Sequence, residues 1–532
     1  MPKTKWIIFS GGVLSGLGKG IASASVGALL ASKYKVIPLK CDGYLNVDPG
    51  TMNPIEHGEV FVLEDGGEVD MDFGHYERFL GVYCKSEWNL TMGKVFDAVR
   101  KRERKGDFLG KTVQFVPHVT NTIKDWWREI ARKEKAEVML IEIGGTIGDI
   151  ENELYVEAAR QLKNDVGEKN IMYVHLTYVP IPSGVHEQKS KPTQQSVNLL
   201  RQRGIAPDMI IGRCSEILDD KIKQKIATFC DVSEEAVITG VDVDNVYKIP
   251  LVFEQEGVPK ILKKCLGIKP APSLRKWRKL VDKLSNGKKT VNIAICGKYT
   301  KLEDSYASVV EAINHSAAHL DCKANITFEE TTGLKDPSKL LKNIDGVIVP
   351  GGFGGRGIEG KINVVKYCRE SNIPLLGICY GLQLSVTEFA RNICGLKGAN
   401  STEIDEKTKH PVIDILPEQR DVTEKGGTMR LGAYPALLRK GTKIFELYDQ
   451  KENVSERHRH RYEVNPIYHN LLEKNGMQLV GMSPNQRLVE FIEFKYHKYF
   501  VGCQGHPELK STLLKPAPLF YGLVKAALEG NK

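Results

Sequence analysis

Short apolar, β-branched runs alternate with longer amphipathic stretches along almost the whole chain. This alternation constrains the fold more than any other feature, because strands joined through helices pair in parallel within an α/β layer architecture. The sequence therefore predicts an α/β protein. The expected strands are residues 5–10, 36–40, 138–142, 171–177, 209–212, 291–296, 326–329, 346–349, 374–378 and 499–504.

The chain has 532 residues, too many for one hydrophobic core, and its texture changes near the middle. Pro270 and Pro272 interrupt the chain there, and a basic stretch with apolar residues at helical spacing follows. We expect a first domain over residues 1–268, a linker with a basic helix over 269–289, and a second domain over 290–532. A helix lying on a domain surface is the favoured interpretation of the linker, and a calmodulin- or membrane-binding helix is the alternative.

Composition excludes several classes of protein. With 41% hydrophobic and 27% charged residues, the chain is neither disordered nor fibrous. It contains no apolar run long enough for a membrane span and no signal peptide, and its eleven cysteines form no CxxC pair. We therefore expect a cytoplasmic protein without a disulfide framework or zinc site. The net charge of +9 is mild for this length, and phosphate-rich small ligands account for it as well as nucleic acid does.

The apolar run WIIFS leads into a glycine-rich loop, Gly11 to Gly20, and then into a helical sequence. Backbone N–H groups at such a helix start form a phosphate cradle, to which Lys19 adds a positive charge. The loop has one residue more before Gly18 than the standard P-loop, and Gly20 replaces the hydroxyl residue that would hold magnesium. A tight turn without a ligand explains the glycines but not the lysine. We predict a phosphate site whose metal ligands come from elsewhere.

Carboxylates elsewhere in this half could supply those ligands. Glu142 ends the apolar strand VMLIE, at the edge of a parallel sheet where α/β active sites lie. Asp70 and Asp72 form a weaker candidate pair, which could equally be a solvated turn. Magnesium takes one or two carboxylates together with phosphate oxygens and water. Lys40, at the end of another strand, could reach the same phosphates.

A second basic element of this half is the segment KSKPTQ, Lys189 to Gln194. Its two ammonium groups, two hydroxyls and amide could hold a phosphate or an anhydride. A surface loop is nearly as plausible for such a composition. If the segment does bind phosphate, this half holds two phosphorylated ligands.

In the second half, a strand leads into Gly377-Ile-Cys379-Tyr-Gly381 and then into a helix. This is the cysteine counterpart of a nucleophile elbow, in which glycines permit a sharp turn that exposes the sulfur at a helix N-terminus. A thiolate needs a base and an orienting group, and His506 and Glu508 of the segment QGHPE are the candidates. The sequence predicts hydrolysis through an acyl-thioester.

Two further segments could assist this chemistry. The glycine turn PGGFGG, residues 350–355, follows a strand and could direct backbone N–H groups at a tetrahedral oxyanion. The run Arg457-His-Arg-His-Arg461 could be a metal site, but interleaved arginines would repel a divalent cation. Five alternating cationic groups fit an anion or carboxylate clamp better.

Taken together, these motifs resemble the CTP synthase family across nearly the whole chain. The matching segments include GGVLSGLGKGIASAS, EHGEVFVLEDGGEVDMDFGHYERF, EIGGTIGDIE, KSKPTQQSV, PGGFGGRGIEGKI, GICYGLQ, GGTMRLG, RHRHRYEVNP and HPE. The loop SGLGKG and the segment HEQKSKPTQ are closer to eukaryotic and archaeal members than to bacterial ones. The resemblance implies a P-loop-like, dethiobiotin-synthetase-like parallel-sheet domain followed by a flavodoxin-like class I glutamine amidotransferase domain.

The implied activity is that of a glutamine-hydrolysing ligase. ATP phosphorylates the 4-oxygen of UTP, and ammonia released from L-glutamine passes internally and displaces that phosphate to give CTP. Mg²⁺ is the implied cofactor, with Asp72 and Glu142 as its ligands, and Lys19 and Lys40 support phosphoryl transfer. The implied ATP-binding residues are Ser15, Gly16, Leu17, Gly18, Lys19, Gly20, Ile21, Asp72, Arg213, Asp242 and Val243. Those implied for UTP, and for CTP as inhibitor, are Ser15, Asp149, Ile150, Glu151, Lys189, Ser190, Lys191, Pro192, Thr193, Gln194 and Lys225.

For the second domain, the resemblance makes Cys379 the nucleophile, His506 the base and Glu508 its partner. The implied glutamine-binding residues are Gly352, Phe353, Tyr380, Gly381, Leu382, Gln383, Glu403 and Arg461. Arg430 falls in a region tied to activation by GTP, and His57 in a segment that gates the ammonia passage. Homotetramers, in some members filaments, are implied, with no nucleic-acid or membrane partner.

The sequence departs from the family pattern at three positions, and three rival functions compete with this interpretation. Gly505 stands where an aromatic residue usually precedes His-Pro-Glu, Gly43 replaces a usual proline, and Gln195 stands where bacterial members have histidine. These departures affect expected kinetics, not reaction type. The rivals are another amidoligase fused to a glutaminase, a non-catalytic filament scaffold, and a nucleic-acid-binding GTPase. The segment KSKPTQ argues against the first rival. The intact catalytic residues argue against the second, and the absence of GK[ST] argues against the third.

Overall fold

The computed structural model describes residues 4–50, 58–270, 274–298, 303–352, 354–415 and 429–530. The chain divides into two compact units. The first comprises residues 1–49 and 75–278, and the second comprises 50–74 and 279–532. Residues 50–74 therefore pack with the second unit, although the expected boundaries put them in the first domain.

The first unit is built on a seven-stranded sheet in which every neighbouring pair is parallel. The strand order is β5-β2-β6-β1-β7-β8-β9, so the strand that precedes the glycine loop lies at the centre. The strands are β1 (Lys5–Gly11), β2 (Val36–Asp42), β5 (Asn89–Thr91), β6 (Val138–Ile143), β7 (Ile171–Tyr178), β8 (Met209–Cys214) and β9 (Val237–Val241).

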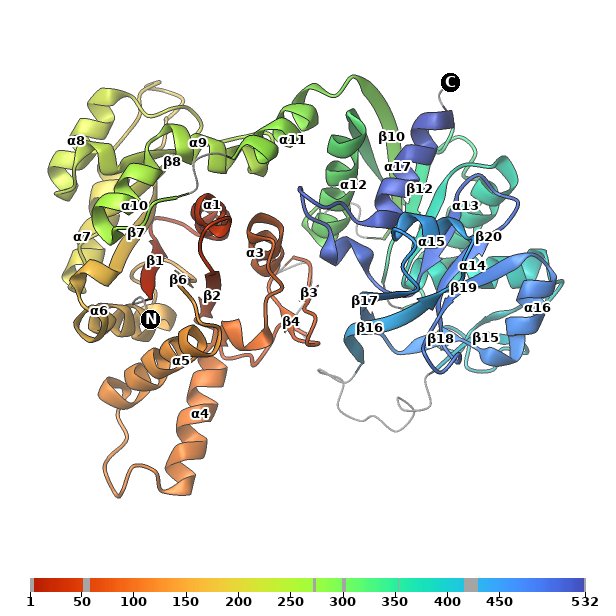
Figure 1. The fold of residues 1–532 in the computed structure, drawn as a ribbon, viewed down its shortest axis with the longest axis horizontal. Coiled ribbons are helices and arrows are strands. Elements are labelled where there is room, and N and C mark those ends of the chain that lie inside the picture. The colour runs from red at the N-terminus through yellow and green to blue at the C-terminus, as the bar shows by residue number, and fades with distance from the viewer. Residues whose placement is uncertain are drawn as a thin grey trace. The chain divides into compact units, whose positions relative to one another are not determined.

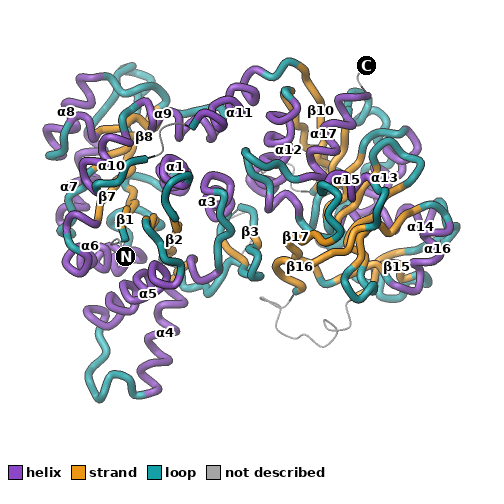
Figure 2. Tube along the Cα trace, viewed as in Figure 1, coloured by secondary structure: helices purple, strands orange, loops and turns teal. Residues whose placement is uncertain are grey.

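Helices connect these strands, as Figure 2 shows by colour. They are α1 (Lys19–Ala31), α4 (Met92–Lys105), α5 (Thr120–Lys133), α6 (Glu153–Val166), α7 (Lys191–Gln202), α8 (Asp220–Cys230), α9 (Ile249–Gln255) and α10 (Val258–Leu266). The strands β2 and β6 are buried along their whole length, as a parallel sheet covered on both faces requires. Because all strands run the same way, the loops that follow them gather at one edge of the sheet.

The second unit contains a nine-stranded mixed sheet in the order β11-β10-β12-β13-β21-β20-β19-β16-β17. The first five strands are parallel: β11 (Cys322–Glu330), β10 (Lys289–Gly297), β12 (Gly346–Val349), β13 (Leu375–Ile378) and β21 (Phe500–Cys503). The last four are antiparallel: β20 (Val489–Phe494), β19 (Met477–Met482), β16 (Arg430–Leu438) and β17 (Asn453–His460).

Alternate residues of β10 show how helices cover both faces of this sheet. Ile293 and Ile295 pack with α12 (Ala307–Leu320) and α17 (Pro518–Gly530), whereas Ala294 and Cys296 pack with α13 (Ile358–Ser371). Figure 1 shows these helices around the strands. The remaining helices are α14 (Tyr380–Asn392), α15 (Lys443–Leu447) and α16 (His469–Lys474).

Two small sheets complete the second unit. One has three strands, β14 (Asn400–Ser401), β15 (Pro411–Ile415) and β18 (Tyr462–Val464). The other is a two-stranded hairpin, β3 (Phe61–Val62) and β4 (Glu68–Val69). We call residues 61–69 the acidic hairpin, because it carries Glu64 and Glu68. The helix α3 (Asp72–Leu80) follows it.

The predicted basic helix is present as α11 (Arg275–Asn286), and the division between the units falls inside it. Within the first unit, the indole of Trp277 packs on Tyr247 and Phe79 and donates a hydrogen bond to the Tyr247 carbonyl at 2.8 Å. Leu280 and Val281 are also buried. The helix thus packs against the protein, as the favoured interpretation held. Among the described residues, no helix has the length and apolar character needed to cross a bilayer.

Each predicted strand is present, with ends that differ by a few residues. The antiparallel strands β16, β17, β19 and β20 were not predicted. The sequence of β17, NVSERHRH, is too polar to indicate a strand, because it pairs at the sheet edge and buries its charges in ion pairs.

Candidate active sites in the two units

The glycine loop of the first unit lies between β1 and α1 at the carboxyl edge of the sheet. Gly16 and Gly18 have φ of 76° and 85°, a conformation that glycine adopts without strain. The predicted helix is present but begins at Lys19, two residues earlier than expected, and the Lys19 ammonium donates to the Gly145 carbonyl at 2.8 Å. Ser15 and Gly16 are exposed, whereas Leu17 and Gly20 are buried. The tip of the loop, residues 13–16, is therefore exposed, whereas Lys19 is buried.

Gly12 meets helix α7 where no side chain would fit. A Cβ atom there would lie 1.6 Å from the Ser196 hydroxyl oxygen. That hydroxyl is hydrogen-bonded at 2.7 Å to Nε2 of His175, whose Nδ1 is bonded at 2.9 Å to Ser10. Burial, with the nearby charge of Lys19, lowers the pKa of His175 to about 3. A neutral histidine thus fixes the end of β1 to β7 and α7.

Glu142, at the end of β6, is 2% exposed and lies among polar groups. It accepts a hydrogen bond from the Tyr76 hydroxyl, and its Oε1 lies 3.8 Å from the Lys40 ammonium. Lys40 also lies 3.5 Å from Oδ1 of Asp42. Asp72 begins α3 but falls among the residues that pack with the second unit. Asp42 was missed in the sequence, although it ends its strand two residues after Lys40.

The chemistry of these donors suits magnesium, which prefers hard oxygen ligands. Across the described ranges, no group of three or more His, Cys, Asp or Glu side chains could hold a metal on its own.

The remaining nucleotide-site candidates lie on loops at the same sheet edge or on the helices that follow. Asp149 accepts from the Thr146 N–H at 2.6 Å, while Ile150 and Glu151 are exposed. Arg213 donates to Asp242 at 2.5 Å and approaches Gly18, within 3.5 Å of a Cβ atom placed there. Val243 is half-buried beside Asp242. Lys225 is exposed on α8.

The KSKPTQ segment leads into helix α7, and some of its side chains are buried and hydrogen-bonded, unlike those of a surface loop. Ser190 accepts from the Gln194 amide at 3.0 Å, and Thr193 shares a 2.6 Å hydrogen bond with Thr177. Lys191 is exposed and Pro192 half-buried at the helix start. Lys189 pairs with Glu187 at 2.8 Å. The buried hydroxyls and amide shape the segment, and the two lysines remain at its surface.

In the second unit, Cys379 occupies the strained turn that its flanking glycines predicted. It has φ 52° and ψ −102° between β13 and α14. A Cβ atom on Gly377 would lie 2.8 Å from the Gly381 carbonyl group, and one on Gly381 would lie 2.0 Å from the Val349 oxygen. Both glycines are therefore required for this turn. The strain at the nucleophile is of the kind that clusters at functional sites.

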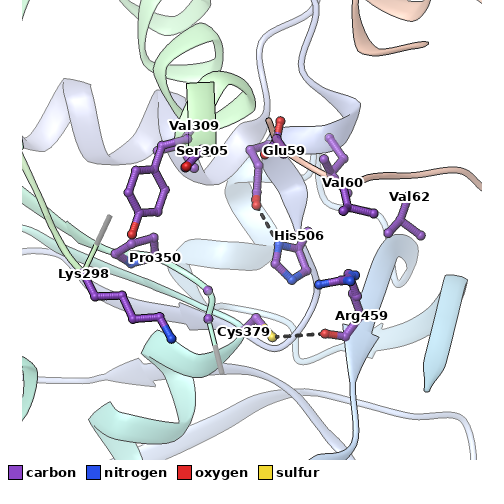
Figure 3. Close-up of a pocket in the computed structure, with 15 residues that line it drawn as sticks. Glu59, Val60, Val62, Lys298, Ser305, Val309, Pro350, Cys379, Arg459 and His506 are labelled. Atoms are coloured by element: carbon purple, nitrogen blue, oxygen red, sulfur yellow. Dashed lines mark hydrogen bonds and ion pairs between the residues drawn. The ribbon is translucent and has the colours of Figure 1, made fainter. Parts of the chain in front are cut away.

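His506 lies beside Cys379 (Figure 3), and Glu508 lines the same cavity, so the three residues lie together as predicted. Nδ1 of His506 is hydrogen-bonded to Glu508 Oε1 at 2.7 Å, and a further hydrogen bond joins the imidazole to Cys379. Burial opposes charge on the imidazole. The Glu508 carboxylate and the sulfur outweigh that effect, so the pKa of His506 is raised well above its ordinary value. This favours the imidazolium form of His506 beside the Cys379 sulfur.

A cavity of about 170 Å³ opens beside the catalytic pair within the second unit. The glycine turn at Gly351 and Gly352 forms part of its wall, and a Cβ atom on Gly351 would lie 2.8 Å from His506 Cε1. Figure 3 shows Lys298 and Arg459 at the same cavity. Val60 and Val62, from the first part of the chain, give it apolar lining that the sequence did not predict.

A second, smaller cavity at Cys379 collects the predicted glutamine-binding side chains. Its lining residues are Gly352, Cys379, Tyr380, Gln383, Glu403, His460, Arg461 and Tyr462. Leu382 points instead into the hydrophobic core, and Gly381 serves the turn. His460 and Tyr462 were missed as lining residues. Phe353 and His57 lie outside the described residues.

Glu403 gives the smaller cavity its carboxylate. It accepts from the Gly354 N–H at 2.8 Å, and burial raises its pKa although Lys298 and that hydrogen bond oppose the shift. The buried ammonium of Lys361 lies 3.9 Å from a Cβ position on Gly352, and burial with the charge of Lys298 lowers the pKa of Lys361 to about 8. Two lysines thus flank the glycine turn that could stabilise an oxyanion.

The alternating run 457–461 is not a set of five cations. Burial and the charge of Arg430 lower the pKa values of His458 and His460 well below the ordinary value, so both are neutral. Only the arginines carry charge. Arg457 and Arg459 pair with Glu64 and Glu68 of the acidic hairpin. The predicted carboxylate clamp is therefore occupied, at these two arginines, by carboxylates of the same chain.

Arg430 is buried at the start of β16. Its guanidinium donates to Glu463 at 2.9 Å and to Glu490 at 2.6 Å and lies 4.4 Å from the Tyr434 ring centroid. Burial raises the pKa of both carboxyls, although the guanidinium opposes that shift. Arg430 is therefore a link between strands in the folded unit.

The structure gives a physical reason for two departures from the family pattern. A Cβ atom on Gly43 would lie 2.7 Å from Cβ of Glu151. One on Gly505 would lie 2.8 Å from Cβ of Glu456 and 3.0 Å from the Arg457 oxygen. Each glycine leaves room that a neighbouring residue fills. Gln195 is exposed on α7.

Comparisons with known proteins agree across the whole chain. Residues 5–268 match the family model "CTP synthase N-terminus" and residues 301–526 match "Glutamine amidotransferase class-I". A protein named CTP synthase from Borreliella afzelii (strain PKo) is 52% identical over 531 residues, covering 98% of this chain and 99% of the relative. The CTP synthase of the archaeon Methanocaldococcus jannaschii is likewise 52% identical, covering 98% of each chain.

Among solved structures, the chain is similar to "Trypanosoma brucei CTPS - glutaminase domain with bound acivicin". The identity is 35%, and the match covers 45% of this chain and 94% of that one, with a TM-score of 0.42.

Proposed function

The chain belongs to the CTP synthase family, and from this premise we propose how its residues divide the work of converting UTP to CTP. The enzyme is a glutamine-hydrolysing ligase whose substrates are ATP, UTP and glutamine. The observation that carries the proposal is the meeting of Cys379, His506 and Glu508 beside a cavity lined by five expected glutamine ligands.

In the second unit, the Cys379 sulfur attacks the side-chain carboxamide of glutamine. His506, held by Glu508, takes the thiol proton and gives it to the leaving ammonia. It then takes a proton from the water that hydrolyses the thioester and returns it to the departing Cys379 sulfur. Backbone N–H groups of the 351–352 turn face the developing oxyanion, and the Lys298 and Lys361 charges favour it. Glu403 and Arg461 hold the α-amino and α-carboxylate groups of the substrate.

Ammonia then leaves by the larger cavity. Its apolar wall at Val60 and Val62 suits a neutral molecule and keeps water from protonating it. The proposed gate, His57, precedes these two valines in the sequence.

In the first unit, the β1–α1 loop from Ser15 to Ile21 holds ATP phosphates. Lys19 and Lys40 offset the charge that develops when the γ-phosphoryl group moves to the 4-oxygen of UTP. Arg213, Asp242 and Val243 approach the adenine. UTP, or CTP as inhibitor, is held by the residues of two loops, 149–151 and 189–194, and by Lys225. Phosphorylation turns a poor leaving oxygen into a good one, and ammonia displaces it.

Magnesium is the proposed cofactor of this half. Glu142 and Asp72 would hold it, and the bound ion supplies charge neutralisation on the triphosphate. Support comes from the buried Glu142 carboxylate and from Gly20 in place of a hydroxyl. For Asp72 the proposal rests on the family motif.

Regulation and assembly follow the family in this proposal. The enzyme forms homotetramers, and filaments under some conditions, and responds to GTP and CTP. Arg430 acts in GTP activation by holding β16 in place, since Glu463 and Glu490 already occupy its guanidinium. The cytoplasm is the proposed compartment, and the eleven free thiols support it. Sedimentation with and without nucleotides, and rate titrations with GTP and CTP, test this group of proposals.

Replacing the nucleophile separates the two reactions. Cys379→Ala should lower glutamine-dependent CTP formation by roughly a thousandfold or more, because no thioester can form. Ammonia-dependent formation should persist. Absorbance assays of UTP conversion with ATP, magnesium and either nitrogen source measure both. The control is Cys394→Ala, just past the other end of α14, which should change neither rate. Equal loss with both nitrogen sources would contradict the two-site proposal.

A further inference from the structure

The strand β17 contacts both proposed catalytic residues through its backbone. The carbonyl of Arg457 accepts a hydrogen bond from the His506 N–H at 2.7 Å. Two residues on, the carbonyl of Arg459 accepts from the Cys379 sulfur at 3.8 Å. The position of β17 therefore bears on the nucleophile and on its base at the same time.

The side chains of the same two arginines are held by the acidic hairpin. Arg457, which is fully buried, donates from Nε to Glu64 at 3.1 Å and from Nη1 to the Val62 carbonyl at 3.0 Å. Arg459 donates from Nε to Glu68 at 2.8 Å. Residues two apart on a strand face the same side, so the hairpin meets both arginines together.

A backbone contact also fixes the hairpin. Gly432 on β16 has φ 93°, and a Cβ atom there would lie 2.6 Å from the Gly66 nitrogen and 2.9 Å from the Glu64 oxygen. The Ala433 N–H donates to that same oxygen at 3.0 Å. Lys510, four residues after His506, lies 3.4 Å from Glu64 and donates to the Ser455 carbonyl of β17 at 2.8 Å.

We propose that the acidic hairpin is a positioning element of the glutaminase site, with Glu64 acting on His506 through Arg457 and Glu68 acting on Cys379 through Arg459. By sequence the hairpin lies within the segment matched by the synthase N-terminal family model, residues 5–268, yet it packs in the second unit. The N-terminal half thus contributes two carboxylates that set the geometry of glutamine hydrolysis. This inference rests on the proposed roles of Cys379 and His506.

Removing the two charges tests the proposal. In the full-length double variant Glu64→Gln/Glu68→Gln, the kcat of glutamine hydrolysis should fall roughly ten- to a hundredfold, because small displacements of catalytic groups are that costly. The KM for glutamine should stay near its original value, since the smaller cavity at Cys379 does not include the hairpin. Ammonia-dependent CTP formation should be unchanged. Glu68→Asp, which keeps the carboxylate, should retain part of the kcat that the double variant loses.

A steric variant tests the same contact without removing charge. Gly432→Ala forces the hairpin backbone away and should lower kcat in the same selective way. Gly441→Ala is its matched control, because Gly441 also has a positive φ, 75°, but open space around its Cβ position. Glu473→Gln is the charge control, since Glu473 pairs with Arg439 at the surface.

The outcomes separate the two levels of inference. Full glutaminase activity in both the double variant and Gly432→Ala would overturn the positioning role and leave the function intact. A parallel loss of glutamine- and ammonia-dependent activity with a lower unfolding midpoint would show general destabilisation, which also overturns it. No glutaminase activity in the unmodified enzyme would instead contradict the proposed function.

Discussion

At the scale of single residues, charge decides how the glutaminase site works. The imidazole of His506 is half-buried, which by itself disfavours its charge, yet its pKa is raised because the carboxylate of Glu508 and the sulfur of Cys379 lie beside it. Neighbouring His458 and His460 have lowered pKa values, because burial and the charge of Arg430 outweigh the nearby carboxyl groups of Glu490 and Glu463. Histidines of one unit thus take opposite charge states, according to the burial and the charges that surround each imidazole.

Replacing Glu508 by glutamine should shift the pH dependence of glutamine hydrolysis. The amide keeps a hydrogen bond to Nδ1 but removes the negative charge, so the pKa of His506 falls. The descending alkaline limb of kcat/KM, where the imidazolium is lost, should move to lower pH by roughly one to three units. Rate profiles across pH measure the shift. Glu508→Asp keeps the charge and should keep most of the limb in place; an unmoved limb in Glu508→Gln would show that Glu508 does not set this pKa.

At the scale of elements, glycines lie where a turn or strand approaches a helix too closely for a side chain. The loop after β1 meets α7 at Gly12, and β13 meets α14 at Gly377 and Gly381. In each case the contact is with backbone or with a hydroxyl already in a hydrogen bond. Both active sites therefore depend on a strand-to-helix turn packed too closely for any side chain.

Gly12→Ala should destabilise the first unit by about 1–3 kcal/mol, because its Cβ atom overlaps the Ser196 hydroxyl. Thermal or denaturant unfolding measures the loss. Adding Ser196→Gly makes room and should restore part of the stability. Gly184→Ala, in a first-unit loop with open space at its Cβ position, is the control and should have little effect. Unchanged stability in Gly12→Ala would mean that α7 can move away freely.

At the scale of the whole molecule, the proposed function gives each unit one half-reaction. Cys379, His506 and the smaller cavity belong to the second unit, whereas Lys19, Lys40 and Glu142 belong to the first. In that proposal a thiol hydrolyses the nitrogen donor and a phosphate site activates the acceptor. Variants should therefore separate the two reactions.

Glu142→Gln should abolish CTP formation from both glutamine and ammonia, while glutamine hydrolysis continues. The change removes the buried carboxylate that faces Lys40 and that we propose as a metal ligand. Parallel assays of CTP and glutamate formation test this. Glu168→Gln, at an exposed surface pair with Lys163, should alter neither product. Retained CTP formation in Glu142→Gln would remove Glu142 from the metal site.

The sequence by itself determined the elements and the reactive groups. Continuous apolar runs located the principal strands, because those strands are buried on both faces of their sheets. Apolar residues at helical spacing located α11. Glycines around Lys19 and Cys379 indicated their turns, because only glycine fits there. The resemblance supplied residue roles that no local pattern contains.

Tertiary structure decided which distant charges meet. Nothing local in NVSERHRH shows that two of its arginines pair with Glu64 and Glu68 almost four hundred residues earlier, or that its histidines are neutral. Nor does the sequence near residue 60 show that this stretch leaves its own half to pack on β17. Ion pairing and burial depend on neighbours in space, and only the folded chain brings those neighbours together.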